Sequence, residues 1–337
     1  MERFARQPRI TIIDVARHAR VSKTTVSHVI SGKRAVSPGT RERVQQAIDA
    51  LGYRPSGPAR SLRTRQTHMV SLILPDITNP FYPVLARGLE EGLEVHGYRA
   101  FICSSDGDPD RERAYVNEVA DRGVDGIVLD SFHLTVHDLH AATGGRLPIV
   151  WIGGLQLDHP GVDSVRSDDE GGAYEATVHL VERGHRRIAM IDGPIGSGTA
   201  RRDGYRRALT EAGLAALPEP PLRGDYTREG GRAVAERLLR LDPAPTAVFC
   251  ANDLSAIGVL DAARAAELRV PDDLAVVGFD DIELASLVAP ALSTVRNPAF
   301  TTGREAARLL TERMTGAHQG PARIVTLPSP LVTRASS

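Results

Sequence analysis

A short row of hydrogen-bonding side chains near the start of the chain has a spacing suited to contacts with nucleic acid. At helical spacing, Val26 and Val29 face inward. The polar members of the row then share the outward face: Lys23, Thr24, Ser27 and His28. Amines, hydroxyls and imidazoles bind base edges in the major groove and phosphate oxygens beside it. The row therefore predicts a DNA-reading helix.

The charge of the chain is divided unevenly along its length. Residues 1–65 carry 14 Lys and Arg against four acids, a net charge of about +10. The whole chain has a net charge of −1, so the remainder is near −11. A basic head on an acidic body indicates a module that binds a polyanion, joined to a second function. A solvated basic tail is the simpler alternative.

Length and composition exclude several classes of protein. A chain of 337 residues suits two or three domains, and 42% hydrophobic with 25% charged residues is ordinary for a soluble globular protein. No apolar run reaches the ~18 residues of a membrane span. The start has no apolar core of a secretory signal. Two cysteines exclude a disulfide framework and a four-thiolate zinc site. We expect a cytoplasmic protein without a membrane partner.

Cap residues divide the basic segment into three short helices. Hydroxyl residues stand where each helix is expected to begin: Thr11, Ser22 and Ser37. Gly32 and Gly52 follow the second and third helices, where glycine ends a helix. Two short helices across a tight turn, supported by a third, form a helix-turn-helix. A plain three-helix bundle shares this periodicity, but the charge and the polar row favour DNA binding.

This segment resembles the headpiece of LacI/GalR-family repressors. The matching stretches are residues 11–16, 21–29, 36–44 and 51–55. The resemblance implies base contacts for three residues: Lys23, Thr24 and His28. It implies phosphate contacts for three more: Ser22, Thr25 and Ser27. We also assign Thr11, Ser37 and Tyr53 to the DNA-binding surface. One residue departs from the family, since Arg20 stands where the turn usually has glycine.

Residues 56–66 are similar to the hinge of the same family. That hinge is disordered when free and becomes helical on the operator, where a leucine enters the minor groove. Leu62 matches this leucine, and Arg60 beside it is assigned to DNA. Packing of Leu62 against the body is the alternative. Gly57-Pro58 replaces the usual helix-forming residues, so we expect a less stable hinge helix.

From residue 69 onward, short apolar runs alternate with helical patterns. The predicted strands are residues 69–74, 100–103, 126–129, 149–152, 187–191, 247–250 and 274–278. Predicted helices between them include residues 83–95, 111–121, 171–183, 230–239 and 254–266. Repeated βα units predict parallel sheets with helices on both faces and ligands at the carboxyl ends of the strands.

The body resembles the periplasmic-binding-protein-like core of the same family. The markers are residues 76–82, 184–189, 251–253, 276–281 and 290–295. The expected fold is thus α/β: an all-α helix-turn-helix headpiece and a core of two parallel-sheet subdomains. The expected segments are headpiece 9–55, hinge 56–66 and core 67–337. Within the core we expect an N-subdomain of about 67–167 with 299–327, and a C-subdomain of about 168–296 with 328–337. No leucine-heptad extension follows Val332, so we expect a homodimer.

The resemblance also implies an effector site between the subdomains. Its residues are Phe81, Tyr82, Arg201, Tyr226, Asn252, Asp280 and Asn297. Carboxylate, guanidinium and amide groups bind hydroxyls in pairs, and aromatic rings cover apolar ring faces. Each residue also has a structural reading, such as a helix cap for Asp280. Two features depart from the family: the loop 193–200 is short, and Gly153 stands where an Asp is common.

Other motifs give little support for a nucleotide site or a metal site. Gly193, Gly196 and Gly198 match neither phosphate-binding order, and His133, His137 and His140 lack the carboxylates or thiols that accompany a metal. No nucleophile arrangement has a supporting context, so we predict no cofactor, no metal and no enzyme activity.

We therefore expect a regulator, most simply a repressor, bound to a near-palindromic operator. Its effector is expected to be a sugar or sugar derivative. A soluble sugar-binding protein and a sugar-converting α/β enzyme are the alternatives, and neither needs the basic head.

Overall fold

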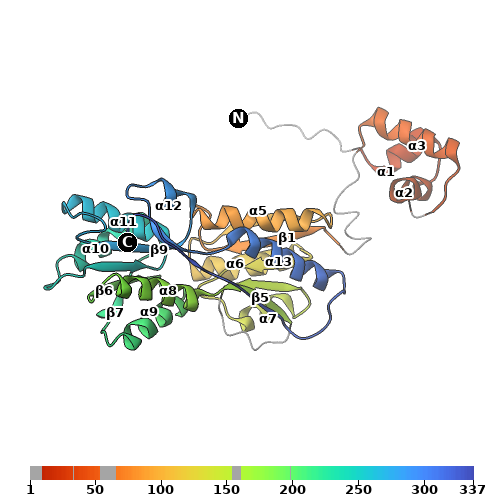
Figure 1. The fold of residues 1–337 in the computed structure, drawn as a ribbon. Helices are drawn as coiled ribbons and strands as arrows, with labels where there is room; N and C mark the ends of the chain where they lie inside the picture. The colour runs from red at the N-terminus through yellow and green to blue at the C-terminus, as the bar shows by residue number, and fades with distance from the viewer. Residues whose placement is uncertain (1–9, 33, 54–65, 154–160, 198) are drawn as a thin grey trace. The chain divides into compact units, whose positions relative to one another are not determined.

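A computed structural model describes residues 10–32, 34–53, 66–153, 161–197 and 199–337. The chain folds as two separate units that divide between Thr67 and His68 (Figure 1). None of the helices in the described parts is both long and apolar enough to cross a membrane. The predicted hinge, with Arg60 and Leu62, lies outside the described residues.

In the part of the first unit that the structure describes, the chain forms helices α1 (Ile12–Ala19), α2 (Lys23–Ser31) and α3 (Pro38–Leu51). They begin directly after the predicted caps Thr11, Ser22 and Ser37, and at α2 the Ser22 side chain accepts a hydrogen bond from the Thr25 amide at 3.0 Å. Small apolar side chains from all three helices form the core: Val15, Ala16, Ala19, Val26, Val29, Val44 and Ala47.

The turn between α1 and α2 contains Arg20 at the position where the family usually has glycine. Arg20 takes the left-handed conformation, with φ 52° and ψ 48°. A side chain pays about 1 kcal/mol or more for this backbone, which glycine adopts freely. The turn therefore keeps the geometry of the helix-turn-helix, with backbone strain at Arg20.

The second unit contains two six-stranded sheets. The first has the order β11-β5-β4-β3-β1-β2, and all its paired strands are parallel. Its strands are β1 (Met69–Leu74), β2 (Arg99–Ser104), β3 (Gly126–Leu129), β4 (Ile149–Ile152), β5 (Val162–Ser167) and β11 (Ile324–Leu327). Its helices are α5 (Phe81–Glu94), α6 (Pro109–Asp121), α7 (Val136–Thr143) and α13 (Ala299–Met314). Separate apolar clusters pack α5 with α13 and α6 with α7 on the sheet.

The second sheet has the order β12-β10-β9-β8-β6-β7. Its strands are β6 (Ile188–Asp192), β7 (Leu217–Arg223), β8 (Ala247–Cys250), β9 (Ala275–Asp280), β10 (Ser293–Arg296) and β12 (Leu331–Val332). Its helices are α8 (Asp169–Glu182), α9 (Ala200–Glu211), α10 (Arg228–Leu238), α11 (Asp253–Ala265) and α12 (Glu283–Leu287). The short strand β12 pairs with β10 in the antiparallel direction, so this sheet departs from the purely parallel expectation at one edge.

Candidate functional site

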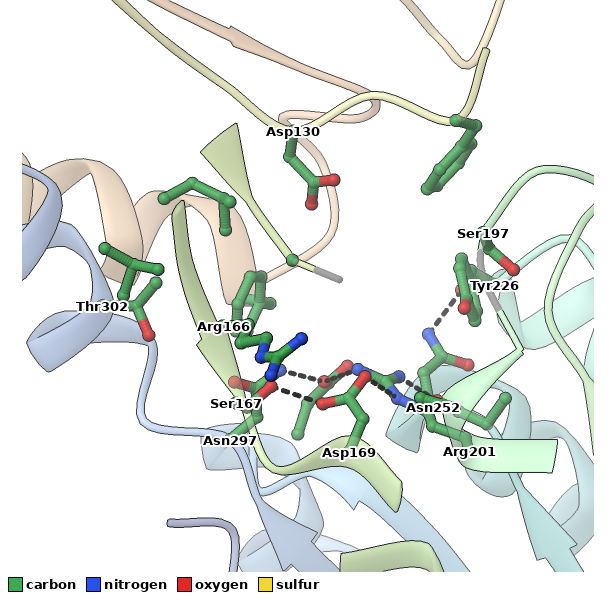
Figure 2. A pocket seen from close by; sticks show the side chains of 18 of the residues that line it. Asp130, Arg166, Ser167, Asp169, Ser197, Arg201, Tyr226, Asn252, Asn297 and Thr302 are labelled. Atoms are coloured by element: carbon green, nitrogen blue, oxygen red, sulfur yellow. Dashed lines mark hydrogen bonds and ion pairs between the residues drawn. The ribbon is translucent and has the colours of Figure 1, made fainter. Parts of the chain in front are cut away.

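A cavity of about 360 Å³ lies in the second unit, at the ends of strands from both sheets (Figure 2). All seven side chains that the resemblance assigned to the effector line it: Phe81, Tyr82, Arg201, Tyr226, Asn252, Asp280 and Asn297. They come from α5, α9, α11, the end of β9 and the loops after β7 and β10. The structure brings the seven side chains together, and their role in binding an effector stays a prediction.

Arg201, in the first turn of α9, is held by groups from three other elements. Its Nε donates to Asp169 Oδ2 at 2.9 Å, and its Nη2 lies 3.7 Å from Asp280 Oδ1. The guanidinium also donates to the carbonyl of Ala251 and stacks on Phe279, 3.8 Å from the ring centroid. Burial alone lowers the pKa of Arg201, but the two carboxylates more than offset it and raise the pKa above its usual value. Arg201 is thus a fixed positive charge.

Asp280 ends β9 in a strained conformation, with φ 112°. The Asn297 side-chain amide donates to its Oδ1 at 3.1 Å. Burial raises the pKa of Asp280 to about 6, although Arg201 and Asn297 act in the opposite direction. Non-glycine residues in this backbone region are often found at binding sites, where the surrounding structure holds them.

The other side of the cavity carries an aromatic pair and a carboxylate. Phe81 and Tyr82 lie edge to face, with ring centroids 5.2 Å apart. The Tyr82 hydroxyl donates to Asp130 Oδ2 at 2.9 Å. Burial raises the pKa of Asp130 to about 7 and that of Tyr82 well above its usual value. Asp130 directly follows the apolar run of β3, so its place at a strand's carboxyl end was the signal that would have found it.

Asn252 and Tyr226 form one connected corner. The Asn252 side chain donates to the Tyr226 carbonyl at 2.9 Å and accepts from the Ser255 amide at 3.0 Å. Asn252 therefore caps α11 as well as lining the cavity. Tyr226 has φ 66°, and its ring lies 6.1 Å from that of Phe132 between centroids.

The loop after β3 closes part of the cavity wall. Glu112, fully buried in α6, accepts hydrogen bonds from the Ser131 hydroxyl at 2.6 Å and the amides of Phe132 and His133 at 3.2 and 3.1 Å. This carboxylate fixes the loop and aims Phe132 at the cavity. Further lining residues that the sequence reasoning missed include Asp130, Ser131, Phe132, Trp151, Arg166, Asp169, Asp192, Ser197 and Thr302.

The predicted DNA-binding residues fall into two groups. Lys23 and Thr24 are exposed, and Ser27 and His28 are partly exposed on the same helix α2. The remaining described members serve the helix ends as well: Thr11 binds Asp14, Ser22 binds Thr25, Ser37 donates to Thr40 at 2.9 Å, and Tyr53 packs against the core. Their roles on DNA remain predictions.

The histidines singled out from the sequence are not placed as ligands. His133 Nε2 lies 3.1 Å from the Gly107 carbonyl. Across the described residues, no group of three or more His, Cys, Asp or Glu side chains is arranged to hold a metal ion.

Comparison with known proteins supplies the family. Residues 11–56 match the model "Bacterial regulatory proteins, lacI family", and residues 177–337 match "Periplasmic binding protein-like domain". Catabolite control protein A of Priestia megaterium is 37% identical over 332 residues, covering 97% of this chain and 99% of that protein. The chain belongs to the lacI family of bacterial regulators. Another lacI-family relative, the repressor PurR of Aliivibrio salmonicida, is 35% identical and covers 97% of this chain and 98% of its own length.

Solved structures of the lacI family agree with this fold. A complex of the transcriptional regulator CelR with cellobiose is 36% identical, with TM-score 0.73, covering 98% of this chain and 100% of that one. A lac repressor dimer bound to operator and an anti-inducer is 26% identical, with TM-score 0.86, covering 98% and 99%. These relatives are regulators of transcription, so the chain is a lacI-family regulator and not an enzyme.

Proposed function

We propose that this lacI-family chain is a cytoplasmic repressor whose affinity for a near-palindromic operator is set by a small sugar-like effector. The observation that carries the proposal is the convergence of seven hydrogen-bonding and aromatic side chains on one cavity of about 360 Å³. That size suits a mono- or disaccharide-sized ligand, since small-molecule pockets span a few hundred cubic ångströms.

The chemistry of the cavity suits hydroxyl groups. Arg201 and Asn297 donate, while Asp280 and Asp169 accept, so neighbouring hydroxyls on a ring can be bound in pairs. Phe81, Phe132 and Tyr226 offer aromatic faces for the apolar side of a sugar ring. The cellobiose complex of CelR supports a carbohydrate in a cavity of this fold.

On DNA, α2 enters the major groove of each half-site. Lys23, Thr24 and His28 contact base edges, while Ser22, Thr25 and Ser27, with Thr11, Ser37 and Tyr53, hold the backbone. Residues 56–66 form the hinge, from which Leu62 and Arg60 reach the minor groove. The proposed headpiece is residues 9–55.

A homodimer places two such headpieces on one operator. Both halves of the core have apolar side chains open to solvent that a second copy can cover. Val84, Val95 and Ile102 are 47%, 81% and 46% exposed on the first sheet's half, and Leu284 and Leu287 are 43% and 68% exposed on α12. The lac repressor neighbour is a dimer on its operator, which supports the same assembly here.

Effector binding acts through the two halves of the core. We assign the N-subdomain to residues 67–167 with 299–327 and the C-subdomain to residues 168–296 with 328–337. The cavity is lined from both, so a ligand that fits one arrangement of the halves better than another shifts the equilibrium between them. The hinge and headpieces follow that shift.

A gel-shift titration of the full chain on palindromic operators, with and without carbohydrates, tests the function. We expect a retarded band of the dimer bound to operator DNA, and we expect one class of carbohydrate either to increase or to decrease the affinity of this complex. Absence of sequence-specific retardation on any selected operator contradicts the proposal, and so does retardation that no small molecule changes.

A further inference from the structure

Asp130 differs from the other carboxylates of the cavity. Asp169 and Asp280 share Arg201, and Asp192 pairs with Arg202 at 2.6 Å. Glu170 pairs with Arg207, and Asp168 caps α8 by accepting from the Gly171 amide at 3.0 Å. Within the described residues, Asp130 has no ion pair, and its side chain has one hydrogen-bond partner, the Tyr82 hydroxyl.

The surroundings of Asp130 leave its second carboxylate oxygen open to the cavity. A Cβ atom at Gly153, on the neighbouring strand end, would lie 3.9 Å from Oδ1. A carboxylate at 153 would thus crowd Asp130, and glycine there leaves one acidic group in this place. In Figure 2 the Asp130 carboxylate points into the cavity, on the side away from the Asp169–Arg201 pair.

A carboxylate in a partly dry site without a cation is costly, so it takes up a proton or attracts a positive group. The charges that face Asp130 do not remove this cost. Arg201 from α9 acts on it from beyond ion-pair distance, while Glu112 from α6 and Asp169 from α8 oppose its ionisation and Tyr82 from α5 donates a hydrogen bond. Within the described residues, no guanidinium therefore lies within ion-pair distance of Asp130, although Arg166 and Arg201 also line the cavity.

We propose that the effector is a polyhydroxylated ligand that carries one protonated amine, such as an amino sugar, and that Asp130 binds the amine. This rests on the proposed function and narrows its ligand class. The ammonium donates to the open Oδ1 while Tyr82 keeps Oδ2, and the hydroxyls reach Arg201, Asp280 and Asn297. A ligand with a phosphate or carboxylate would meet like charge at the same end.

The test is calorimetric binding of matched ligands to the full chain at pH 7. The probes are glucosamine, galactosamine and mannosamine, each beside its N-acetyl derivative and its parent sugar. We expect one amine to bind at least ten-fold more tightly than its two neutral partners. Asp130→Asn should reduce that preference to within three-fold. Asp110→Asn, the same change of charge at an exposed α6 side chain outside the cavity, should keep it.

The second readout is the release of protons on binding. Burial raises the pKa of Asp130 to about 7 in the free protein, so binding of an ammonium should release protons from Asp130, and the release should be smaller in Asp130→Asn. Calorimetry in two buffers of different ionisation enthalpy measures this release. Three results overturn the proposal: no amine binds, neutral partners bind equally well, or the preference and proton release survive Asp130→Asn. Retardation of operator DNA is measured separately. A failure of the proposed amine ligand can therefore be told apart from a failure of the proposed regulator function.

Discussion

A Cβ atom added to Gly196 would lie 2.1 Å from the carbonyl oxygen of Phe132. Gly196 follows β6 of the second sheet, and Phe132 follows β3 of the first. The two halves of the core therefore touch backbone to backbone beside the cavity, and Gly196 also has φ +90°, which disfavours any side chain.

Replacing Gly196 with Ala should hold the two halves apart. The contact cannot accommodate a methyl group, so the cavity should open and Trp151, the one tryptophan of the chain, should become more accessible. We expect acrylamide quenching of Trp151 to rise at least two-fold. Gly184→Ala is the matched control, because Gly184 has φ +96° but nothing within 4 Å of an added Cβ. Equal quenching in both variants would assign the effect to backbone strain.

Removing the charged groups of the cavity should separate ligand sensing from DNA binding. Arg201→Ala or Asp280→Asn breaks a buried charged hydrogen-bond network, which should weaken effector binding by about 100-fold. Operator affinity without ligand should stay within about threefold, because the headpiece is a separate folding unit. Arg232→Ala, on an exposed i,i+4 pair of α10, serves as control. A normal ligand response in both cavity variants would refute the site.

The stabilisation that protonated Asp130 and Asp280 give to the core should fall as pH rises between about 4 and about 7. The pKa values of Asp130 and Asp280, about 7 and about 6, lie above the unfolded value, so the folded state binds more protons in this range. Their contribution is full at acid pH and is lost as each folded pKa is passed. Asp130→Asn should flatten the decline, measured by urea unfolding at several pH values. An unchanged slope would place Asp130 in a more solvated state than we infer.

Operator binding should weaken steeply with salt. Two heads of about +10 displace counterions from many phosphates, so the slope of log affinity against log salt should be steeper than about −4. Fluorescence anisotropy on a fixed operator between low and physiological salt measures it. A slope near zero would contradict DNA binding by the basic segment.

His28→Ala should relax the preference at one base pair of each half-site by roughly 1–3 kcal/mol. The reason is the position of His28 on the exposed side of α2, beside Lys23 and Thr24. Affinities for a set of single-base operator variants give the pattern. If all sites weaken alike, His28 contacts phosphate instead.

Local signals predicted the elements that depend on local chemistry. The caps Ser22 and Ser37 and the glycines at 32 and 52 place the three headpiece helices, and the apolar runs place β1, β3, β4 and β8 at the predicted bounds. Strands β5, β7, β10, β11 and β12 were not predicted. The sequence of β5, Val-Asp-Ser-Val-Arg-Ser, mixes charge with apolar residues, and β7 contains three prolines. Their pairing with β4 and β6 determines these strands.

The lining of the cavity was predicted from the family resemblance more than from the chemistry and spacing of the residues. The resemblance placed the seven residues, whereas the buried acid Asp130 and the cross-cavity contact of Gly196 depend on side chains and backbones brought together from distant parts of the chain. For Arg20, the sequence showed that a non-glycine residue stands at the turn where the family usually has glycine. Only the structure showed that Arg20 adopts the left-handed backbone conformation there.

The strand order of the core has a consequence for biosynthesis. The first sheet is completed by β11 and the second by β12, the last two strands of the chain, and Asp163 on β5 waits for Arg313 and Arg323 to neutralise it. The three helices of the headpiece end at Leu51, and Tyr53 completes their packing. During translation the headpiece is therefore complete while both sheets still lack an edge. Folding of the headpiece can therefore precede assembly of the cavity during synthesis, because the cavity needs residues from both sheets.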